Sequence, residues 1–397
     1  MLCALNIKLN LAIINFLMQI NSKLPNIGTT IFTVMSGLAK ENNAINLSQG
    51  FPDFGCSTHL LSLAQKYMNE GFNQYAPMQG VIQLRERISE IMSTCYGATY
   101  SPDTEITVTA GATQGIYTCI AAFVNKGDEV IIFEPAYDCY TPAIEVHGGI
   151  TIPVQLKFPD FTIDWEEVKQ KINAKTKMII INTPHNPSGT VLSKPDLIAL
   201  ENLVRGKNIV VVSDEVYEHM AFDNAPHQSV ARFESLRSQS IIVSSFGKTV
   251  HTTGWKIGYV AAPAELMKEF RKVHQFLVFA VNHPFQLALA DYLSDKNNYL
   301  DLKNFYQQKR DYFQNLIKGS RFTLSKCTGT YFQLLGYKNI SEEKDTDFAI
   351  RLTKEKKLAS VPLSVFYSQP KDDKLLRFCF AKKEETLEKA AEIINKI

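Results

Sequence analysis

The sequence predicts an α/β protein with a mostly parallel central sheet, helices on both faces of that sheet, and a smaller α+β domain beside it. Between about residues 105 and 260, short runs of β-branched residues alternate with amphipathic segments of helical length. Strands that are apolar along nearly their whole length indicate a sheet covered on both faces, and such sheets are largely parallel. After about residue 290, charged helical patterns replace this alternation, and 397 residues are enough for two domains.

The expected elements follow in chain order. We expect the strands of the central sheet at residues 106–108, 129–133, 178–181, 209–212, 241–243 and 259–261, with helices at 113–125 and 196–206 between them. The C-terminal part has expected helices at 299–317, 346–357 and 384–397 and strands at 331–334 and 375–378. The expected divisions are an N-terminal extension (1–22), a segment that packs with the small domain (23–45), a large domain (46–288) and a small domain (289–397).

Composition excludes several classes of protein. A hydrophobic fraction of 45% and a charged fraction of 21% are ordinary for a soluble globular protein, and a formal charge of +2 provides no field for nucleic acid or a membrane surface. The seven cysteines are scattered and form no CxxC pair, which predicts reduced thiols, a cytoplasmic location and no metal site. The apolar run at residues 11–17 is interrupted by Asn15 and has no cleavage site, so we expect a poorly ordered extension, or a translation start at Met18, rather than secretion.

The lysine at position 248 is the candidate nucleophile. It follows a predicted strand through the turn Ser244-Ser245-Phe246-Gly247-Lys248. A lysine held in a partly dry pocket loses its ammonium form and attacks carbonyl groups. A single loop lysine is more often a plain surface residue. Here the small hydroxyl residues and the glycine before it, with the further phosphate donors of residues 252–256, favour a Schiff-base enzyme that uses pyridoxal phosphate.

Polar residues follow several other predicted strands, where α/β sheets bind ligands. Asp214 either caps a helix or pairs with the pyridine nitrogen of the cofactor, and Tyr217 is placed to donate to the phenolic oxygen of the cofactor ring. Residues 109–115 form a strand-to-helix turn that suits an anion, although such turns are common. Asn186 lies in a rigid turn with two prolines, and Tyr137 either stacks on a cofactor or packs in the core.

An arginine at position 377 lies in an apolar predicted strand and needs an anionic partner. A planar guanidinium matches a carboxylate with two parallel hydrogen bonds. The partner is either a substrate carboxylate or an internal salt bridge, and the residues alone favour neither.

Together these motifs resemble the fold-type I, class I aminotransferases that depend on pyridoxal phosphate. The similarity extends from about Lys23 to the end of the chain. The motifs at residues 46–54, 73–75, 183–189 and 245–249 are similar to the kynurenine/glutamine aminotransferase branch. Those at residues 28–33, 73–80 and 361–366 are similar to bacterial methionine aminotransferases.

The resemblance implies a role for each matching residue. Lys248 holds the cofactor covalently and moves the substrate proton, Asp214 pairs with the ring nitrogen, and Tyr217 completes the catalytic set. The remaining cofactor contacts that the resemblance implies are Asn186 at the ring oxygen, Tyr137 on the ring face, Gly111, Ala112, Thr113, Ser245 and Lys256 around the phosphate, and Tyr75 from a second subunit of a homodimer. The implied substrate contacts are Arg377, Asn186, Gly50 and Phe32. Many relatives outside this branch have arginine where this chain has Lys256, and lysine also binds phosphate.

The expected reaction moves the amino group of methionine, and of aromatic amino acids, to a 2-oxo acid in two half-reactions with ping-pong kinetics. No second arginine is evident for a dicarboxylate, and Phe32, Phe51, Phe54 and Phe366 suggest an apolar pocket. The alternative is a kynurenine or glutamine transaminase with β-lyase side activity on cysteine conjugates. A catalytically silent relative is disfavoured because all expected groups are present, and a nicotinamide dehydrogenase is disfavoured because no GxGxxG turn follows a strand.

Overall fold

The computed structural model of the chain describes residues 21–369 and 371–397. The predicted N-terminal extension (residues 1–22), its apolar run and Met18 therefore lie almost entirely outside the described residues. No helix in the described part of the chain is long and apolar enough to cross a membrane.

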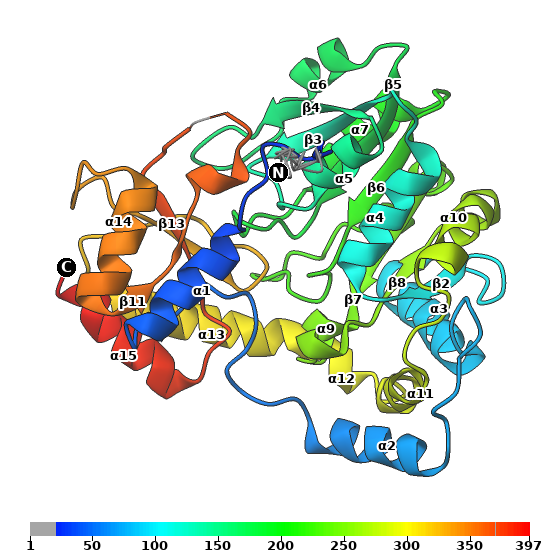
Figure 1. The fold of residues 1–397 in the computed structure, drawn as a ribbon, viewed down its shortest axis with the longest axis horizontal. Coiled ribbons are helices and arrows are strands. Elements are labelled where there is room, and N and C mark those ends of the chain that lie inside the picture. Colours follow the sequence, from blue (N-terminus) through cyan, green and yellow to red (C-terminus); the bar gives the residue numbers. More distant parts are fainter. Residues whose placement is uncertain (1–20, 370) are drawn as a thin grey trace, which may run out of the picture.

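A sheet of seven strands forms the centre of the larger part (Figure 1). Its strand order is β2-β8-β7-β6-β5-β3-β4, and all neighbours are parallel except that β8 runs antiparallel to both β2 and β7. The strands are β2 (Ile106–Thr109), β3 (Glu129–Glu134), β4 (Ile150–Gln155), β5 (Thr176–Asn182), β6 (Val210–Asp214), β7 (Ser240–Ser245) and β8 (Gly258–Ala261). The prediction of a mostly parallel sheet is confirmed, and every predicted strand of the sheet forms.

The strand β4 is absent from the predicted elements. It lies at the sheet edge with most of its residues only partly buried, and Pro153 interrupts its apolar pattern. A proline is tolerated at an edge because its missing N–H faces no neighbouring strand. The sequence of β4 therefore lacks the continuous apolar run by which the other strands of the sheet are recognised.

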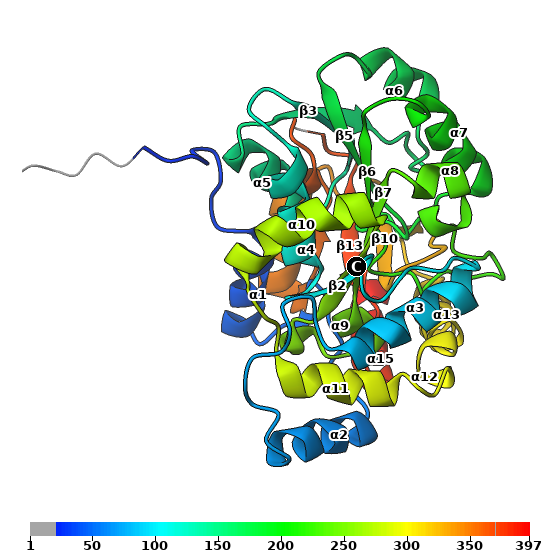
Figure 2. The same ribbon diagram turned by 90° about the vertical axis from the view of Figure 1, so that its right-hand side faces the viewer.

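Helices cover both faces of the sheet (Figures 1 and 2). Successive residues of one strand face opposite cores: Val212 packs in the core that includes residues of α4, α5 and α10, and Val211 packs in the core that includes residues of α3, α7 and α11. These helices and their neighbours are α2 (Thr58–Asn69), α3 (Ile82–Tyr96), α4 (Ala112–Phe123), α5 (Tyr140–Val146), α6 (Trp165–Lys171), α7 (Lys194–Val204), α8 (Glu234–Arg237), α9 (Phe246–Thr249), α10 (Ala264–Leu277) and α11 (His283–Tyr292).

The smaller part is built from both ends of the described chain. Strand β1 (Ile45–Asn46) pairs in parallel with β11 (Leu358–Ala359), so the segment before residue 46 packs with the C-terminal residues. The boundary predicted at residue 288 falls inside α11, and the domain division stays a prediction. The other elements of this part are α1 (Ile31–Glu41), α12 (Asn297–Leu300), α13 (Leu302–Ile317), β9 (Thr323–Leu324), β10 (Phe332–Gly336), α14 (Asp345–Arg351), β12 (Val361–Pro362), β13 (Leu375–Cys379) and α15 (Glu384–Asn395).

Three neighbouring parallel strands determine where a ligand binds. Strands β5, β6 and β7 lie side by side, and their carboxyl ends are Asn182, Asp214 and Ser245. Because parallel strands end at the same edge, these polar residues meet there, facing β10 and β13 of the smaller part.

Candidate active site

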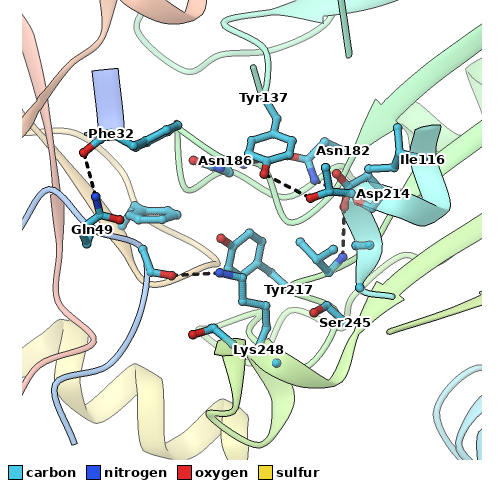
Figure 3. Close-up of a pocket in the computed structure, with 18 of the residues that line it drawn as sticks. Phe32, Gln49, Ile116, Tyr137, Asn182, Asn186, Asp214, Tyr217, Ser245 and Lys248 are labelled. Carbon is cyan, nitrogen blue, oxygen red and sulfur yellow. Dashed lines mark hydrogen bonds between the residues drawn. The ribbon is translucent and has the colours of Figure 1, made fainter. Parts of the chain in front are cut away.

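A cavity of about 300 Å³ opens at the carboxyl edge of the sheet, between the two parts of the chain (Figure 3). Every predicted site residue except Tyr75 lines it. The cavity therefore joins strand ends of the sheet to residues of α1, β10 and β13, which the chain supplies from its two ends.

The amino group of Lys248 lies in this cavity, on the short helix α9 that begins directly after β7. Its Nζ donates hydrogen bonds to the carbonyl oxygen of Gly50 at 2.9 Å and to the hydroxyl oxygen of Tyr331 at 2.7 Å. Burial is the main cause that lowers the pKa of Lys248 to about 8. Near neutral pH the neutral fraction of this amine is therefore far larger than that of an ordinary lysine, as a nucleophilic amine requires.

The carboxylate of Asp214 faces the same cavity from the end of β6. Tyr140 donates a hydrogen bond of 2.5 Å to its Oδ2, and the backbone N–H of Val216 donates to its Oδ1 at 3.3 Å. Burial raises the pKa of Asp214 to about 6, although both hydrogen bonds lower it. No helix follows within the next residues, so the alternative of a helix cap does not apply.

The guanidinium of Arg377 is fully buried and has no carboxylate partner within the described residues. Its Nη1 donates to Oδ1 of Asn186 at 2.6 Å, its Nη2 donates to the carbonyl of Ser48 at 3.1 Å, and its Nε has no hydrogen-bond partner. The aromatic rings of Phe332 and Phe32 lie 3.9 and 5.2 Å from its Cζ. The alternative of an internal salt bridge is thus not observed, and a buried positive charge with a free donor is suited to an external anion.

The opposite wall of the cavity combines a helix start with a cation. Gly111 precedes α4 with φ +79, and a Cβ at this position would lie 3.3 Å from Nζ of Lys256. Lys256 itself has φ +54, a left-handed conformation that directs it back toward this turn. The N-terminus of a helix, a lysine and the hydroxyl of Ser245 form a donor set for a phosphate.

These groups fit pyridoxal phosphate. The helix start, Ser245 and Lys256 suit its phosphate, the buried carboxylate of Asp214 suits a protonated ring nitrogen, and Lys248 suits its aldehyde. Tyr137 also lines the cavity (Figure 3), and its hydroxyl lies 3.5 Å from Oγ1 of Thr113.

Several residues of the site are missing from the sequence prediction. Tyr331 contacts Lys248, Tyr140 contacts Asp214, and Asn182 bridges Asp214 and Asn186: its Nδ2 donates to the carbonyl of Asp214 and its Oδ1 accepts from the backbone N–H of Asn186. Asn182 carries a usable signal, because it ends a buried strand. The sequence gives no such signal for Tyr140 or Tyr331, because each contacts its partner from a segment that is remote in sequence.

The predicted aromatic pocket is smaller than the sequence suggested. Phe32 lines the cavity and Phe366 packs behind it, with 5.9 Å between ring centroids. Phe51 lies beside Lys382 outside the cavity, and Phe54 packs against an aromatic cluster of α13. The phenylalanine rings that line the cavity are therefore Phe32 and Phe332, and the prediction omitted Phe332.

Tyr75 lies outside this cavity. Its side chain is 81% exposed and its ring packs edge-on against Phe279 at 5.2 Å. Its contribution to the site of a second subunit stays a prediction.

Comparison with known proteins gives consistent matches along the chain. Residues 42–394 match the family described as Aminotransferase class I and II. The chain is 50% identical over 377 residues to the methionine aminotransferase of Escherichia coli (strain K12), covering 95% of this chain and 98% of that protein. It is 33% identical over 410 residues to the kynurenine–oxoglutarate transaminase of Dictyostelium discoideum, covering 93% and 94%.

The fold is similar to a solved structure of the same kind. The crystal structure of YbdL from Escherichia coli, reported with a methionine aminotransferase function, superposes with a TM-score of 0.94 and 49% sequence identity. The match covers 96% of this chain and 100% of that chain.

Proposed function

The chain belongs to the class I and II aminotransferases, and we propose that within this family it moves the amino group of methionine, and of aromatic amino acids, to a 2-oxo acid. It is a pyridoxal-phosphate-dependent aminotransferase. The observation that carries the proposal is Arg377, a buried cation with no carboxylate partner among the residues that the structure describes. It faces the same cavity as the Lys248 amine and the Asp214 carboxylate. The 50% identity to the methionine aminotransferase of Escherichia coli supports methionine as the amino donor.

The cofactor is held by the residues whose chemistry matches each of its parts. Gly111, Ala112, Thr113, Ser245 and Lys256 would bind the phosphate, Asp214 would pair with the ring nitrogen, Tyr217 and Asn186 would donate to the ring oxygen, and Tyr137 would cover the ring face. The bound cofactor supplies an electron-accepting ring that stabilises negative charge at the substrate Cα. Asp214 keeps its charge for this task because its pKa, although raised to about 6 by burial, remains below neutral pH.

Arg377 binds the carboxylate of the amino acid. Its Nη1 and Nη2 each hold one bond inside the protein, to Asn186 and to Ser48, which leaves Nε and one hydrogen on each terminal nitrogen for the substrate. Because this carboxylate is common to every amino acid, Arg377 contributes to affinity for all donors and acceptors.

Lys248 performs the proton transfer. Its amine would be the nucleophile that attaches the cofactor. Once free, Nζ accepts the proton from the substrate Cα in one half-reaction and gives a proton back to Cα in the other. A pKa lowered by burial to about 8 lets the same nitrogen act as base and as acid near neutral pH. Because one site serves both half-reactions, the kinetics are ping-pong.

The walls of the cavity favour an apolar side chain. Within the described residues, the cationic side chains that line it are Lys248, Lys256 and Arg377, and each has a task already. A dicarboxylate would need another cation for its second carboxylate. Phe32 and Phe332 offer apolar surface instead, which suits methionine or an aromatic amino acid.

The proposal includes a homodimer in which Tyr75 reaches the site of the partner. Tyr75 is 81% exposed, and the nearby chain also exposes Phe276 by 87% and Phe279 by 53%. Tyr75 and Phe279 pack against each other, and adjoining exposed aromatic residues are typical of a subunit interface. A cytoplasmic location belongs to the same proposal and is supported by the free thiols of the described cysteines.

The alternative is a kynurenine or glutamine transaminase with cysteine-conjugate β-lyase side activity, which the Dictyostelium discoideum relative favours at 33% identity. A panel of amino donors with one oxo acid separates the two: we expect the highest kcat/KM for methionine. The variant Lys248→Ala is the blank and is expected to have no turnover. A higher kcat/KM for kynurenine or glutamine would identify the chain as the alternative transaminase. Turnover by Lys248→Ala would overturn the assignment of the nucleophile.

A further inference from the structure

The hydroxyl group of Tyr331 contacts the reactive amine directly. Tyr331 directly precedes β10, its side chain is fully buried, and its oxygen lies 2.7 Å from Nζ of Lys248. The same hydroxyl also contacts the carbonyl oxygen of Gly50, to which Nζ is bonded as well. Three polar atoms therefore form a closed triangle, and only one of them, Nζ, reacts.

The directions of these hydrogen bonds follow from the chemistry of the groups. The carbonyl of Gly50 can only accept, so Tyr331 donates its single hydroxyl hydrogen to that carbonyl. The oxygen of Tyr331 then has only lone pairs left for Lys248, and it accepts from Nζ. Both partners of Nζ are therefore acceptors. A neutral amine that gives its two hydrogens to them has a lone pair with one fixed direction.

We propose that the hydroxyl of Tyr331 and the carbonyl of Gly50 form a dock for Lys248, a pair of acceptors that orients its Nζ. While Lys248 is free of the cofactor, the dock also stabilises the proton that Nζ carries. This inference rests on the proposed role of Lys248 as the proton-transferring group. Tyr331 is a positioning residue in this account, because it acts on the substrate only through Lys248.

The surroundings keep the Tyr331 hydroxyl in place. Its ring packs against Tyr217, Phe332 and Tyr306, with centroids 5.2, 4.9 and 5.6 Å away. Burial raises the pKa of Tyr331 well above its usual value, so the phenol stays protonated and does not compete with Lys248 as a base. Its contribution is therefore a hydrogen bond and not a charge.

The charged and titratable groups around Nζ set the direction of the expected effect. Burial lowers the pKa of Lys248 most, and the groups that act on it through their charge are Cys379, Arg377, Lys256 and Asp214. An acceptor stabilises an ammonium more than a neutral amine, because the bond to the ammonium is charge-assisted. Loss of the Tyr331 oxygen therefore lowers the pKa of Lys248 further.

The chain offers a matched control for this test. Tyr306 packs against Tyr331 in the same aromatic cluster and is equally buried. Its hydroxyl has no hydrogen-bond partner in the described part of the chain. Tyr306→Phe thus removes a buried hydroxyl that makes no hydrogen bond within the described residues. Tyr331→Phe removes the buried hydroxyl that bonds Lys248 and Gly50. Both variants keep the ring and its packing.

The test measures the pKa of Lys248 in the cofactor-free full chain, by competitive acetylation over a pH series with quantification of the Lys248 peptide by mass spectrometry. In the wild type the pKa is expected near 8. In Tyr331→Phe it is expected to fall by about one unit, and in Tyr306→Phe it is expected to stay at the wild-type value. In the loaded enzyme, Tyr331→Phe lowers kcat with methionine about tenfold and leaves KM unchanged, because Arg377 is untouched.

An unchanged Lys248 pKa in Tyr331→Phe, or an equal shift in Tyr306→Phe, would overturn the dock. If Tyr331→Phe does not fold, Tyr331→Met removes the same oxygen in a flexible apolar side chain, and the same shift is expected. The pKa measurement needs no turnover. It therefore fails independently of the proposed function, which wild-type turnover of methionine tests.

Discussion

Nη1 of Arg377 donates a hydrogen bond of 2.6 Å to Oδ1 of Asn186, although 191 positions separate the two residues. The bond joins β13 of the smaller part to the turn after β5 of the central sheet. It uses the oxygen of the Asn186 amide and leaves the amide nitrogen free to donate into the cavity. One contact thus connects the residue proposed for the substrate carboxylate with a residue proposed for the cofactor ring.

Replacing Arg377 tests its proposed role as the carboxylate ligand. Arg377→Ala is expected to raise KM about 100-fold or more for every amino donor, because two charge-assisted hydrogen bonds are lost in each complex. Steady-state kinetics with methionine, phenylalanine and kynurenine measure this. Arg377→Lys keeps the positive charge without the planar pair of donors and should restore part of the lost affinity for the amino donor. An unchanged KM would mean that Arg377 is structural.

The carboxylate of Asp214 predicts how cofactor affinity depends on pH. Burial raises its pKa in the cofactor-free protein to about 6, so the charged form that pairs with the ring nitrogen is lost as pH falls through about 6. We expect affinity for pyridoxal phosphate to drop by up to about tenfold per pH unit below that point. Equilibrium titration by fluorescence across about pH 5 to 8, a range that brackets the Asp214 pKa of about 6, measures this affinity.

The matched control for that titration is Asp214→Asn. The phosphate of the cofactor also titrates near pH 6, and this effect is common to both proteins. The difference between the two profiles therefore belongs to the carboxylate. Parallel profiles would show that Asp214 does not supply the charge.

A buried carboxylate behind the site predicts a pH-dependent stability. Glu218 accepts hydrogen bonds from the hydroxyl groups of Tyr259 (2.7 Å), Tyr96 and Ser244. Burial by itself raises the pKa of Glu218, but the charge of His219 and these three donors outweigh burial and lower it. Glu218→Gln is expected to reduce the free energy of unfolding by about 2 kcal/mol at neutral pH, because an amide nitrogen faces a hydroxyl donor.

The sign of the pH effect follows from the lowered pKa. The stabilisation by ionised Glu218 is fully present above the pKa of the unfolded chain, near 4.5, and is lost as pH falls through the lower pKa of the folded protein. The difference in the free energy of unfolding between wild type and Glu218→Gln, measured with denaturant, should therefore become smaller below pH 4.5. The exposed Glu86 gives the control variant Glu86→Gln, for which little change is expected. A gap that is independent of pH would contradict the account.

The residues at the strand ends were predictable, and their partners were not. Lys248, Asp214 and Asn186 each follow a continuous apolar run, and the parallel arrangement brings such ends together. Tyr331 contacts Lys248 and Tyr140 contacts Asp214 from segments remote in sequence, so no local sequence pattern predicts these contacts. For the same reason the sequence could not place Phe51 and Phe54 outside the cavity, because side-chain direction depends on tertiary packing.

Lys248, Asp214 and Arg377 are proposed to act together in transferring the amino group of methionine. The most direct measurement is the visible absorption spectrum of the purified protein with its cofactor, recorded before and after methionine is added without any oxo acid. We expect loss of the visible band of the bound cofactor together with release of the oxo acid of methionine, one molecule per chain, as in the first half of a ping-pong reaction. An unchanged spectrum with no oxo acid released would contradict it.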